Sequence, residues 1–325
     1  MKKKKKKVGL FFLAFTDLIL FIILVNAILF LPTFYNHNNT TALGNKSDNS
    51  QSEESQQSDD QTESQTEIDY YADLIQKPYS SYLEMCALDY VALPVPRNRQ
   101  QAIETIQQIA YTYPAMWLIL EKQEQYPDEM LIALAANPEM TDYVYGYLSS
   151  DGSVTGGITD EELPHEYPLF LQWDSRWGYY SYGIGTMGTS GCGPSCLSMA
   201  VYYLTGDKTA TPNAVADYSL SHHFYVKDIG TAWELLDTYP TTFGLKVSRP
   251  SLSEANLKAE LNKGNILICS VRPGDFTYSG HFIVIYDYDE NGFKINDPKC
   301  VYRSRQTWTY EQIQDDIKRT WSIGW

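Results

Sequence analysis

Four stretches of different hydrophobic and polar pattern follow one another along the chain. Residues 8–31 are almost continuously apolar, come directly after a lysine run at residues 2–7, and exceed the roughly 20 residues with which a helix crosses a bilayer. Lysines just before a span favour a cytoplasmic N terminus. The pattern therefore predicts a basic cytoplasmic tail at residues 1–7, a transmembrane signal-anchor helix at residues 8–31, and an extracytoplasmic remainder.

A cleaved signal peptide is the alternative for this N-terminal stretch. A small-x-small processing site is present at Val25, Asn26 and Ala27. Apolar residues continue beyond that site to Leu31, however, and the apolar core is longer than that of a typical signal peptide. We therefore expect an uncleaved anchor, through which the protein contacts the cell membrane.

The middle of the chain changes from a polar to a helical pattern. Residues 32–68 are mostly Asn, Ser, Gln, Thr, Asp and Glu, which predicts a disordered polar linker because such a composition buries too little apolar surface to fold. In residues 69–150 the apolar side chains recur at helical spacing, as between residues 103 and 110, which predicts a small helical subdomain. Residues 151–164 are expected to form a loop.

The last stretch, residues 165–325, has an α+β pattern. A helix is expected from Cys192 to Leu204, ending before Gly206, and Asn291-Gly292 is typical of a hairpin turn. Further helices are expected near residues 213–220, 229–239 and 253–261, and the last of them has Ser251 and Glu254 at capping-box spacing. Strands are expected at residues 265–271, 281–288 and 293–296. Helices therefore come first, and an antiparallel sheet follows.

Composition and charge narrow the range of functions. The chain has 40 Asp plus Glu against 25 Lys plus Arg, a net charge of −15, and residues 2–7 hold six of those bases. A surface this acidic is not built to neutralise phosphates, so we expect no nucleic-acid partner. The five cysteines are odd in number and widely spaced, and they do not form a disulfide framework.

One cysteine lies where a thiol becomes reactive. Cys192 stands between Gly191 and Gly193 at the start of the expected apolar helix. A helix N terminus has partial positive charge and free backbone N–H groups, which favour the thiolate and therefore a better nucleophile. The backbone N–H of Cys192 can also point at a developing oxyanion.

A base and an orienting carboxylate follow in the expected sheet. His281 comes after Ser279-Gly280 at the start of a strand, and Asp297 stands at the end of the hairpin partner of that strand. In an antiparallel pair the two positions lie side by side, so the carboxylate can orient the imidazole. The order Cys, His, Asp is the arrangement of a papain-type cysteine peptidase.

Four short motifs make the resemblance to a family specific. They are Gln172-Trp173-Asp174-Ser175-Arg176-Trp177-Gly178, Ser190-Gly191-Cys192-Gly193-Pro194, Gly280-His281-Phe282 and Asn296-Asp297-Pro298. In order and content this set resembles the stand-alone relatives of the bacteriocin-leader (double-glycine) peptidases, family 39 of the cysteine peptidases. The similarity covers roughly residues 167–325.

The resemblance implies a papain-like fold and a role for each matching residue. Cys192 corresponds to the nucleophile, His281 to the general base and Asp297 to the residue that orients the imidazole. Gln172 corresponds to the donor of the oxyanion hole. In the transporter-linked members this glutamine lies only a few residues before the cysteine, whereas 20 positions separate the two here.

Five neighbouring residues are candidate substrate contacts. Gly191 and Gly193 are expected to leave space for a substrate carbonyl, and Gly280 lies next to the expected base. Trp173 and Trp177 either line a substrate groove or belong to the core.

A zinc site is the metal alternative. It would use Cys192, Cys196, His222 and His223. Cysteines four residues apart and adjacent histidines that point to different faces fit tetrahedral zinc poorly. We therefore expect no metal and no cofactor.

Together these features predict a membrane-anchored extracytoplasmic cysteine peptidase that hydrolyses a peptide or protein substrate through an acyl-enzyme. A hydrolase of the peptide stems of peptidoglycan is an alternative, because the same triad serves that chemistry. A catalytically silent binding or adhesion module with the same fold is the other alternative, and reactivity of Cys192 distinguishes it from an enzyme. The sequence does not indicate an oligomeric state.

Overall fold

The computed structural model describes residues 96–162 and 167–325. The predicted basic tail (1–7), transmembrane helix (8–31) and polar linker (32–68) lie outside this part of the chain, as do residues 69–95 of the predicted helical subdomain. Within residues 96–162 and 167–325, no helix is both long and apolar enough to cross a membrane.

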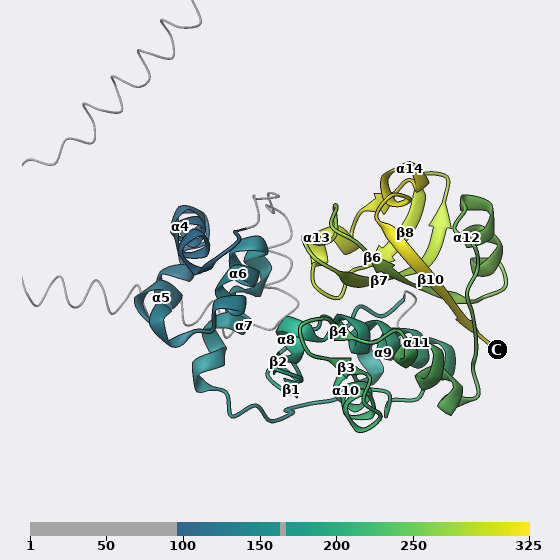
Figure 1. Ribbon diagram of the computed structural model, residues 1–325, viewed down its shortest axis with the longest axis horizontal. Helices are drawn as coiled ribbons and strands as arrows, with labels where there is room; N and C mark the ends of the chain where they lie inside the picture. The colour runs from purple at the N-terminus through teal and green to yellow at the C-terminus, as the bar shows by residue number, and fades with distance from the viewer. Residues whose placement is uncertain (1–95, 163–166) are drawn as a thin grey trace, which may run out of the picture. The chain divides into compact units, whose positions relative to one another are not determined.

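Short helices make up the first described part of the chain. They are α4 (Arg99–Ile109), α5 (Met116–Glu121), α6 (Asp128–Ala136) and α7 (Thr141–Gly146), with 3-10 turns η1 (Gln123–Gln125), η2 (Pro138–Met140) and η3 (Tyr147–Ser149) between and after them (Figure 1). The side chain of Asn98 caps α4 by accepting the N–H of Gln101 at 3.0 Å. Pro138 takes the first position of η2, and Pro127 directly precedes α6. We refer to residues 99–149 as the helical block.

The helical block has its own apolar core. Ile106, Ile119, Leu131 and Leu134 are fully buried in it, and they come from three different helices. The helical spacing of apolar residues in the sequence corresponds to this core, because side chains three and four positions apart share one face of a helix.

A six-stranded sheet forms the centre of the C-terminal domain. Its strands are β5 (Lys246–Ser248), β6 (Ile266–Val271), β7 (His281–Asp289), β8 (Gly292–Asn296), β9 (Thr307–Trp308) and β10 (Ile317–Gly324). They pair in the order β5-β10-β6-β7-β8-β9, and every pair is antiparallel. Gly292, the first residue of β8 after the turn from β7, has a φ of 137°, a conformation that favours glycine. The predicted mixture of helices and antiparallel sheet is confirmed.

The helices of this domain follow the prediction in part. They are α8 (Met187–Ser190), α9 (Cys192–Thr205), α10 (Pro212–Ser221), α11 (Glu234–Thr238), α12 (Glu254–Leu261), α13 (Val301–Ser304) and α14 (Tyr310–Ile313), with 3-10 turns η4 (Asp160–Glu162) and η5 (Tyr239–Phe243). Helix α9 ends at Gly206, whose φ of 71° is the left-handed conformation expected after a helix.

One predicted helix start and one predicted helix cap are wrong. The stretch 229–239 contains strand β4 (Gly230–Thr231), which pairs with β3 (Tyr225–Val226), before the short helix α11 begins. The cap of α12 is Ser253, whose hydroxyl accepts the N–H of Asn256, and Ser251 accepts the side-chain amide of Asn256 instead. A further hairpin joins β1 (Ser181–Tyr182) to β2 (Gly185–Thr186).

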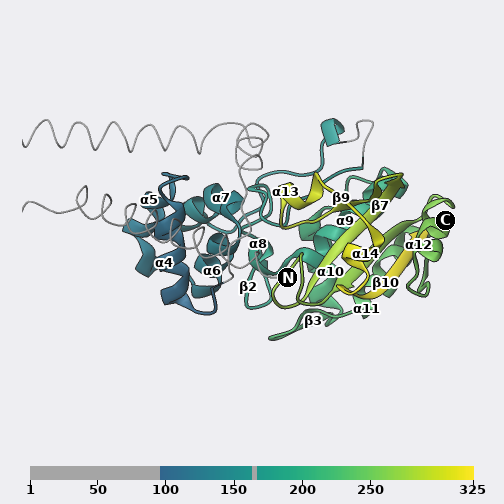
Figure 2. The same ribbon diagram turned by 90° about the horizontal axis from the view of Figure 1, so that it is seen from above.

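Both faces of the central sheet are covered. Ile268, Val284 and Ile323 belong to the core shared with α9, while Leu267 and Ile283 belong to the opposite core, which α12 and α14 complete. Successive side chains of a strand point to opposite faces, so a strand such as β6 is buried throughout. Figure 2 shows the same arrangement from above, with α9 against β7. The first residue of α9 and the first residue of β7 therefore lie close together.

Candidate active site

Cys192 is the first residue of α9 and the only partly exposed cysteine among those described. Its side chain forms a hydrogen bond with the ring of His281. Burial raises the pKa of this thiol, but the hydrogen bond and charge of His281, with the backbone N–H groups of Phe282 and Gly193, outweigh burial and lower it below its ordinary value. The sulfur is therefore biased toward the thiolate.

His281 begins β7 and is 5% exposed. Its Nε2 lies 2.7 Å from Oδ1 of Asp297, so the Nδ1 side of the ring is left for the sulfur of Cys192. Burial lowers the pKa of His281, but the charge and hydrogen bond of Asp297, together with Cys192, raise it to about 9. Both shifts favour the imidazolium–thiolate form of the pair.

Asp297 follows the last residue of β8 and is fully buried. The register of the hairpin pairs Val284 with Asn296, which brings the end of β8 to the start of β7 and so to His281. Its other oxygen, Oδ2, accepts Nε–H of Arg303 at 2.6 Å. Burial opposes ionisation, but the positive charges of Arg303 and His281 hold the pKa of Asp297 well below its usual range.

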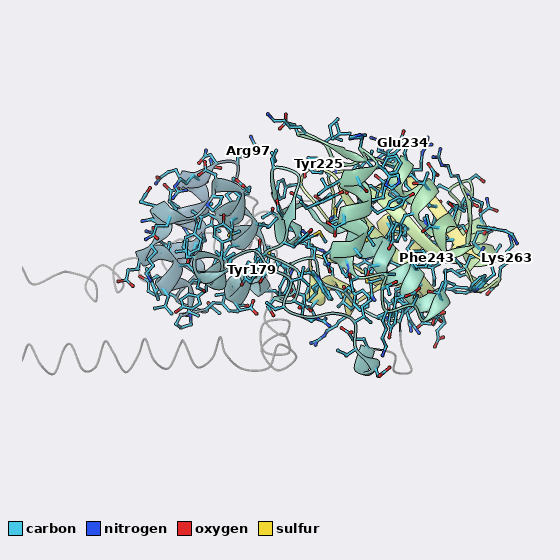
Figure 3. The ribbon with its side chains drawn as sticks, turned by 90° about the horizontal axis from the view of Figure 1, so that it is seen from below. Arg97, Tyr179, Tyr225, Glu234, Phe243 and Lys263 are labelled. Atoms are coloured by element: carbon cyan, nitrogen blue, oxygen red, sulfur yellow. The ribbon has the colours of Figure 1, made fainter. Side chains whose placement is uncertain are left out.

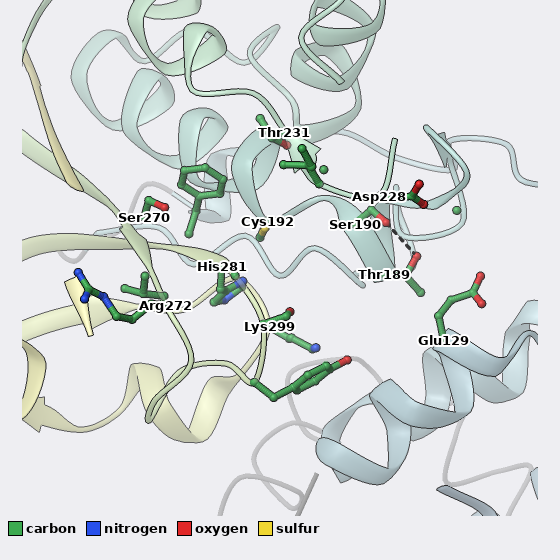
Figure 4. A pocket seen from close by; sticks show the side chains of 18 of the residues that line it. Glu129, Thr189, Ser190, Cys192, Asp228, Thr231, Ser270, Arg272, His281 and Lys299 are labelled. Carbon is green, nitrogen blue, oxygen red and sulfur yellow. Dashed lines mark hydrogen bonds between the residues drawn. The ribbon is translucent and has the colours of Figure 1, made fainter. Parts of the chain in front are cut away.

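These side chains lie at a cavity of about 880 Å³. Cys192 and His281 line it, and the β3–β4 hairpin and the ends of β6 and β7 provide much of its wall (Figure 4). Glu129 and Ala133 of α6 line it as well, so the helical block forms part of the wall. The volume is within the range of ligand sites, and the thiol and imidazole face the space in which a ligand binds.

Gln172 has a different environment from the other motif residues. It is 1% exposed and does not line the cavity; its side-chain amide donates to the carbonyl of Gly188 at 2.7 Å. Its backbone N–H donates to the carbonyl of Pro298, next to Asp297, and its Oε1 is buried without a hydrogen bond. Gln172 thus supports the turn behind the site in this structure, and a role in the oxyanion hole stays a prediction.

Of the two alternatives for Trp173 and Trp177, the structure shows the core: neither residue lines the cavity. Trp173 is 1% exposed and Trp177 is fully buried; their indole N–H groups donate to the carbonyls of Lys299 and Leu171. Trp173 belongs to the core of the helical block and Trp177 to the core beneath α9. Large aromatic side chains have the same sequence pattern in a core and in a groove.

The glycines differ in what they do. Gly280 lines the cavity, as expected. Gly191 and Gly193 do not line it: a Cβ on Gly193 would lie 2.8 Å from the side chain of Thr231, and one on Gly191 would lie 2.5 Å from the carbonyl of Met187. These two glycines therefore permit close packing around the start of α9.

The residues of the zinc alternative do not come together. Cys196 is fully buried, while His222 and His223 are exposed at the end of α10. Nδ1 of His222 lies 2.9 Å from the carbonyl of Tyr218. No group of three or more potential metal ligands occurs within residues 96–162 and 167–325.

Three important residues were missed from the sequence. Arg303 donates a hydrogen bond to Asp297, and Lys299 lines the cavity. Glu139 of η2 is fully buried and accepts the backbone N–H groups of Val301 and Tyr302 at 2.7 and 2.8 Å. No motif marks Glu139, because its partners lie more than 160 positions away in the sequence.

The helical block and the C-terminal domain also meet through aromatic side chains. The ring of Tyr179, marked in Figure 3, stacks on that of Tyr143 with 5.0 Å between ring centroids. The Tyr179 hydroxyl donates to the carbonyl of Tyr143 at 3.0 Å, and the Tyr143 hydroxyl lies 2.6 Å from that of Thr186. Helix α7 is thus joined to the segment that leads into α8 and Cys192.

Comparisons with known proteins agree with the motifs. Residues 164–323 match the model of the family described as Peptidase_C39 like family, which confirms the resemblance. The peptidase domain of Streptococcus ComA, described as a bifunctional ABC transporter of a quorum-sensing pathway, is 17% identical; the match covers 49% of this chain and 98% of that chain, with a TM-score of 0.37. A C39-like peptidase from Bacillus anthracis is 16% identical over 52% of this chain and 97% of that chain, with a TM-score of 0.31. No curated protein matches the chain. Because both TM-scores are below 0.5, the family match alone supports the assignment.

Proposed function

Starting from the match of residues 164–323 to the Peptidase_C39 like family, we propose that the chain is a cysteine peptidase whose triad is Cys192, His281 and Asp297. The observation that supports it most strongly is the hydrogen-bonded series from the Cys192 thiol through His281 to Asp297, located at a cavity large enough for a peptide. A structural cysteine has no need of an imidazole that a buried carboxylate orients.

The proposed reaction uses each member of the triad in turn. The Cys192 thiolate attacks the carbonyl carbon of the peptide bond, and the oxyanion forms next to the N–H groups at the start of α9, which have no carbonyl partner within the helix. The His281 imidazolium then donates its proton to the leaving amine, giving an acyl-enzyme. Water, deprotonated by the now neutral His281, hydrolyses the thioester and regenerates the thiolate. Asp297 stays ionised and keeps the ring in place.

Selective alkylation of Cys192 tests this proposal. Cys86, the one cysteine outside the described residues, is first replaced by serine in the full chain. Limiting iodoacetamide at pH 6.5 should then label Cys192 up to about 100-fold faster than an ordinary thiol, because a thiol of pKa about 8.5 is only about 1% thiolate at that pH. Burial raises the pKa of Cys269 to about 12 and that of Cys196 well above 9, so both are internal references. Mass mapping of the labelled peptides gives the rates.

The alkylation rate of Cys192 should depend on pH in a way that reports both Cys192 and His281. The rate of Cys192 alkylation should stay high as the pH falls below the ordinary thiol pKa, and it should drop only at the lowered pKa of Cys192. At higher pH the ion pair should persist to about pH 9, where His281 loses its proton. In His281→Ala the drop should move to the ordinary thiol pKa, and in His222→Ala, at the exposed end of α10, it should not move. Equal and slow labelling of all cysteines would contradict catalysis and favour the silent binding module.

We also propose that the domain is tethered outside the membrane by residues 8–31. The supporting observation is the lysine run at residues 2–7 directly before that apolar stretch. The full chain expressed in bacterial cells should remain in the membrane fraction after alkaline carbonate washing, with residues 1–7 present in its intact mass. Protease added to spheroplasts should then digest the described domains. Recovery as a soluble chain that lacks its first residues would establish a cleaved signal peptide instead.

A further inference from the structure

Lys299 brings a positive charge into the same cavity as Cys192 and His281. The residue is partly buried, lines the cavity, and has its Nζ 5.4 Å from the centre of the Tyr278 ring (Figure 4). It comes two positions after Asp297, in the loop between β8 and α13. The catalytic steps described above use no group of this side chain.

Hydrogen bonds on both sides fix the backbone of Lys299. Its N–H donates to Oδ1 of Asp297 at 2.7 Å. Its carbonyl accepts the side-chain amide of Asn137 at 2.6 Å and the indole N–H of Trp173 at 2.8 Å. The C-terminal domain and the helical block therefore fix the backbone from which this side chain enters the cavity. Residues of binding sites are typically fixed by such surrounding hydrogen bonds.

The ammonium group forms no ion pair with the described residues. None of their carboxylates lies within 4.0 Å of its Nζ. The nearest carboxylate in sequence, Asp297, is already paired with His281 and Arg303. Burial and the charge of Arg303 lower the pKa of Lys299, and they outweigh the negative charges of Asp297 and Cys192, which raise it. An anion that enters the cavity would remove this cost.

The other cations of the cavity wall are different. Arg272 and Lys318 are exposed to solvent. Lys318 lies over the ring of Trp233 at 5.0 Å, and Arg272 contacts the carbonyl of Ile317 at 3.4 Å. Water screens the charges of such exposed groups, so they discriminate less between ligands than a partly buried ammonium does.

We propose that Lys299 is a specificity residue that binds a carboxylate of the peptide substrate close to the bond that Cys192 attacks. The inference rests on the proposed peptidase function and deepens it by naming the substrate class. The carboxylate has two possible sources with the same chemistry: an acidic side chain near the scissile bond, or a free C terminus. The helical block contributes to this subsite through Asn137.

Peptide binding tests the proposal separately from catalysis. The charge of Lys299 also acts on the Cys192 thiolate, so binding is best measured on the full chain with Cys192→Ala. The probes are fluorescein-labelled nonapeptides of Ala, Gly, Leu and Ser, with Glu or the isosteric Gln at each position in turn and a free or amidated C terminus. Fluorescence anisotropy gives the Kd of each peptide.

The expected result is a preference of about tenfold for a carboxylate over its amide at one position, the size typical of a charge-assisted hydrogen bond. Lys299→Met should abolish this preference and Lys299→Arg should keep most of it. Lys294→Met, which removes an exposed lysine paired with Asp287 outside the cavity, should leave it unchanged. A preference at an internal position identifies an acidic side chain as the source, and a preference for the free over the amidated peptide identifies the C terminus.

Three outcomes would overturn the assignment: equal Kd values for carboxylate and amide peptides, a preference that survives Lys299→Met, or no measurable binding of any peptide. A parallel cleavage assay of the same peptides with the wild-type chain distinguishes the two proposals. Cleavage without a charge preference would contradict the role of Lys299 and support the peptidase. Binding that depends on Lys299, without cleavage, would support the role of Lys299 and contradict the peptidase.

Discussion

Replacing Asp297 with asparagine is expected to lower the free energy of unfolding by about 3–5 kcal/mol, the cost of breaking a buried ion pair from one side. The carboxylate is fully buried and neutralises Arg303, whose side chain is 12% exposed, as well as the His281 imidazolium. An amide of the same size removes the negative charge that faces both cations in this poorly solvated site. Urea unfolding at pH 7 measures the change.

Asp287→Asn is the matched control for this substitution. Asp287 is also on the β7–β8 hairpin and pairs with Lys294 at 2.9 Å, but both side chains are exposed, so the expected change is about 0.2–1 kcal/mol. The pH dependence gives a second readout. Because the pKa of Asp297 is depressed in the folded protein, its stabilisation is complete above about pH 3.9 and is lost as pH falls further toward its folded pKa. Equal small losses in both variants would show that Asp297 is not the buried counter-charge.

Truncating Glu139 to alanine is the second large effect, with an expected loss of about 3 kcal/mol. The carboxylate is fully buried and accepts the backbone N–H groups of Val301 and Tyr302, and the loss of a buried hydrogen-bond partner costs about 1–3 kcal/mol. The same two donors precede Arg303, so hydrogen exchange at Val301 and Tyr302 should accelerate more than exchange in the sheet.

Glu129→Ala is the control within the same helical block. Glu129 is exposed, and a surface substitution of this kind typically changes stability by no more than about 0.5 kcal/mol. Alkylation of Cys192 adds a readout of the site: it should slow in Glu139→Ala, because a looser Arg303 weakens the support of Asp297, and Glu139→Gln should restore part of it. Unchanged exchange at Val301 and Tyr302 in Glu139→Ala would contradict the coupling between the helical block and the site.

The geometry of the site was predictable where its signals are local. The small residues before Cys192 and the apolar run after it define the start of α9, and Asn291-Gly292 marks the hairpin, although its turn is Glu290-Asn291, one residue earlier than predicted. The register of that hairpin then brings His281 and Asp297 together without further information. These features depend on helix starts and turn chemistry, which act over a few residues.

The missed features depend on contacts between distant parts of the chain. Glu139 and Asn137 reach a loop more than 160 residues away, and nothing near them in the sequence marks that contact. Strand β10 was not predicted, because Lys318 and Arg319 interrupt its apolar pattern where the strand is exposed. Trp173 and Trp177 look alike in a core and in a groove, and packing alone decides between the two.

The strand order has a consequence for how the protein is made. Strand β10, the last in chain order, lies between β5 and β6 and is the partner of both. During synthesis from the N terminus, β5 and one edge of β6 remain unpaired until residues 317–324 leave the ribosome. Pairings this distant also slow folding, since the loop between them must close first. A growing chain thus already contains Cys192, His281 and Asp297 before the sheet that supports them is complete, so the site can assemble only after residues 317–324 have paired with β5 and β6.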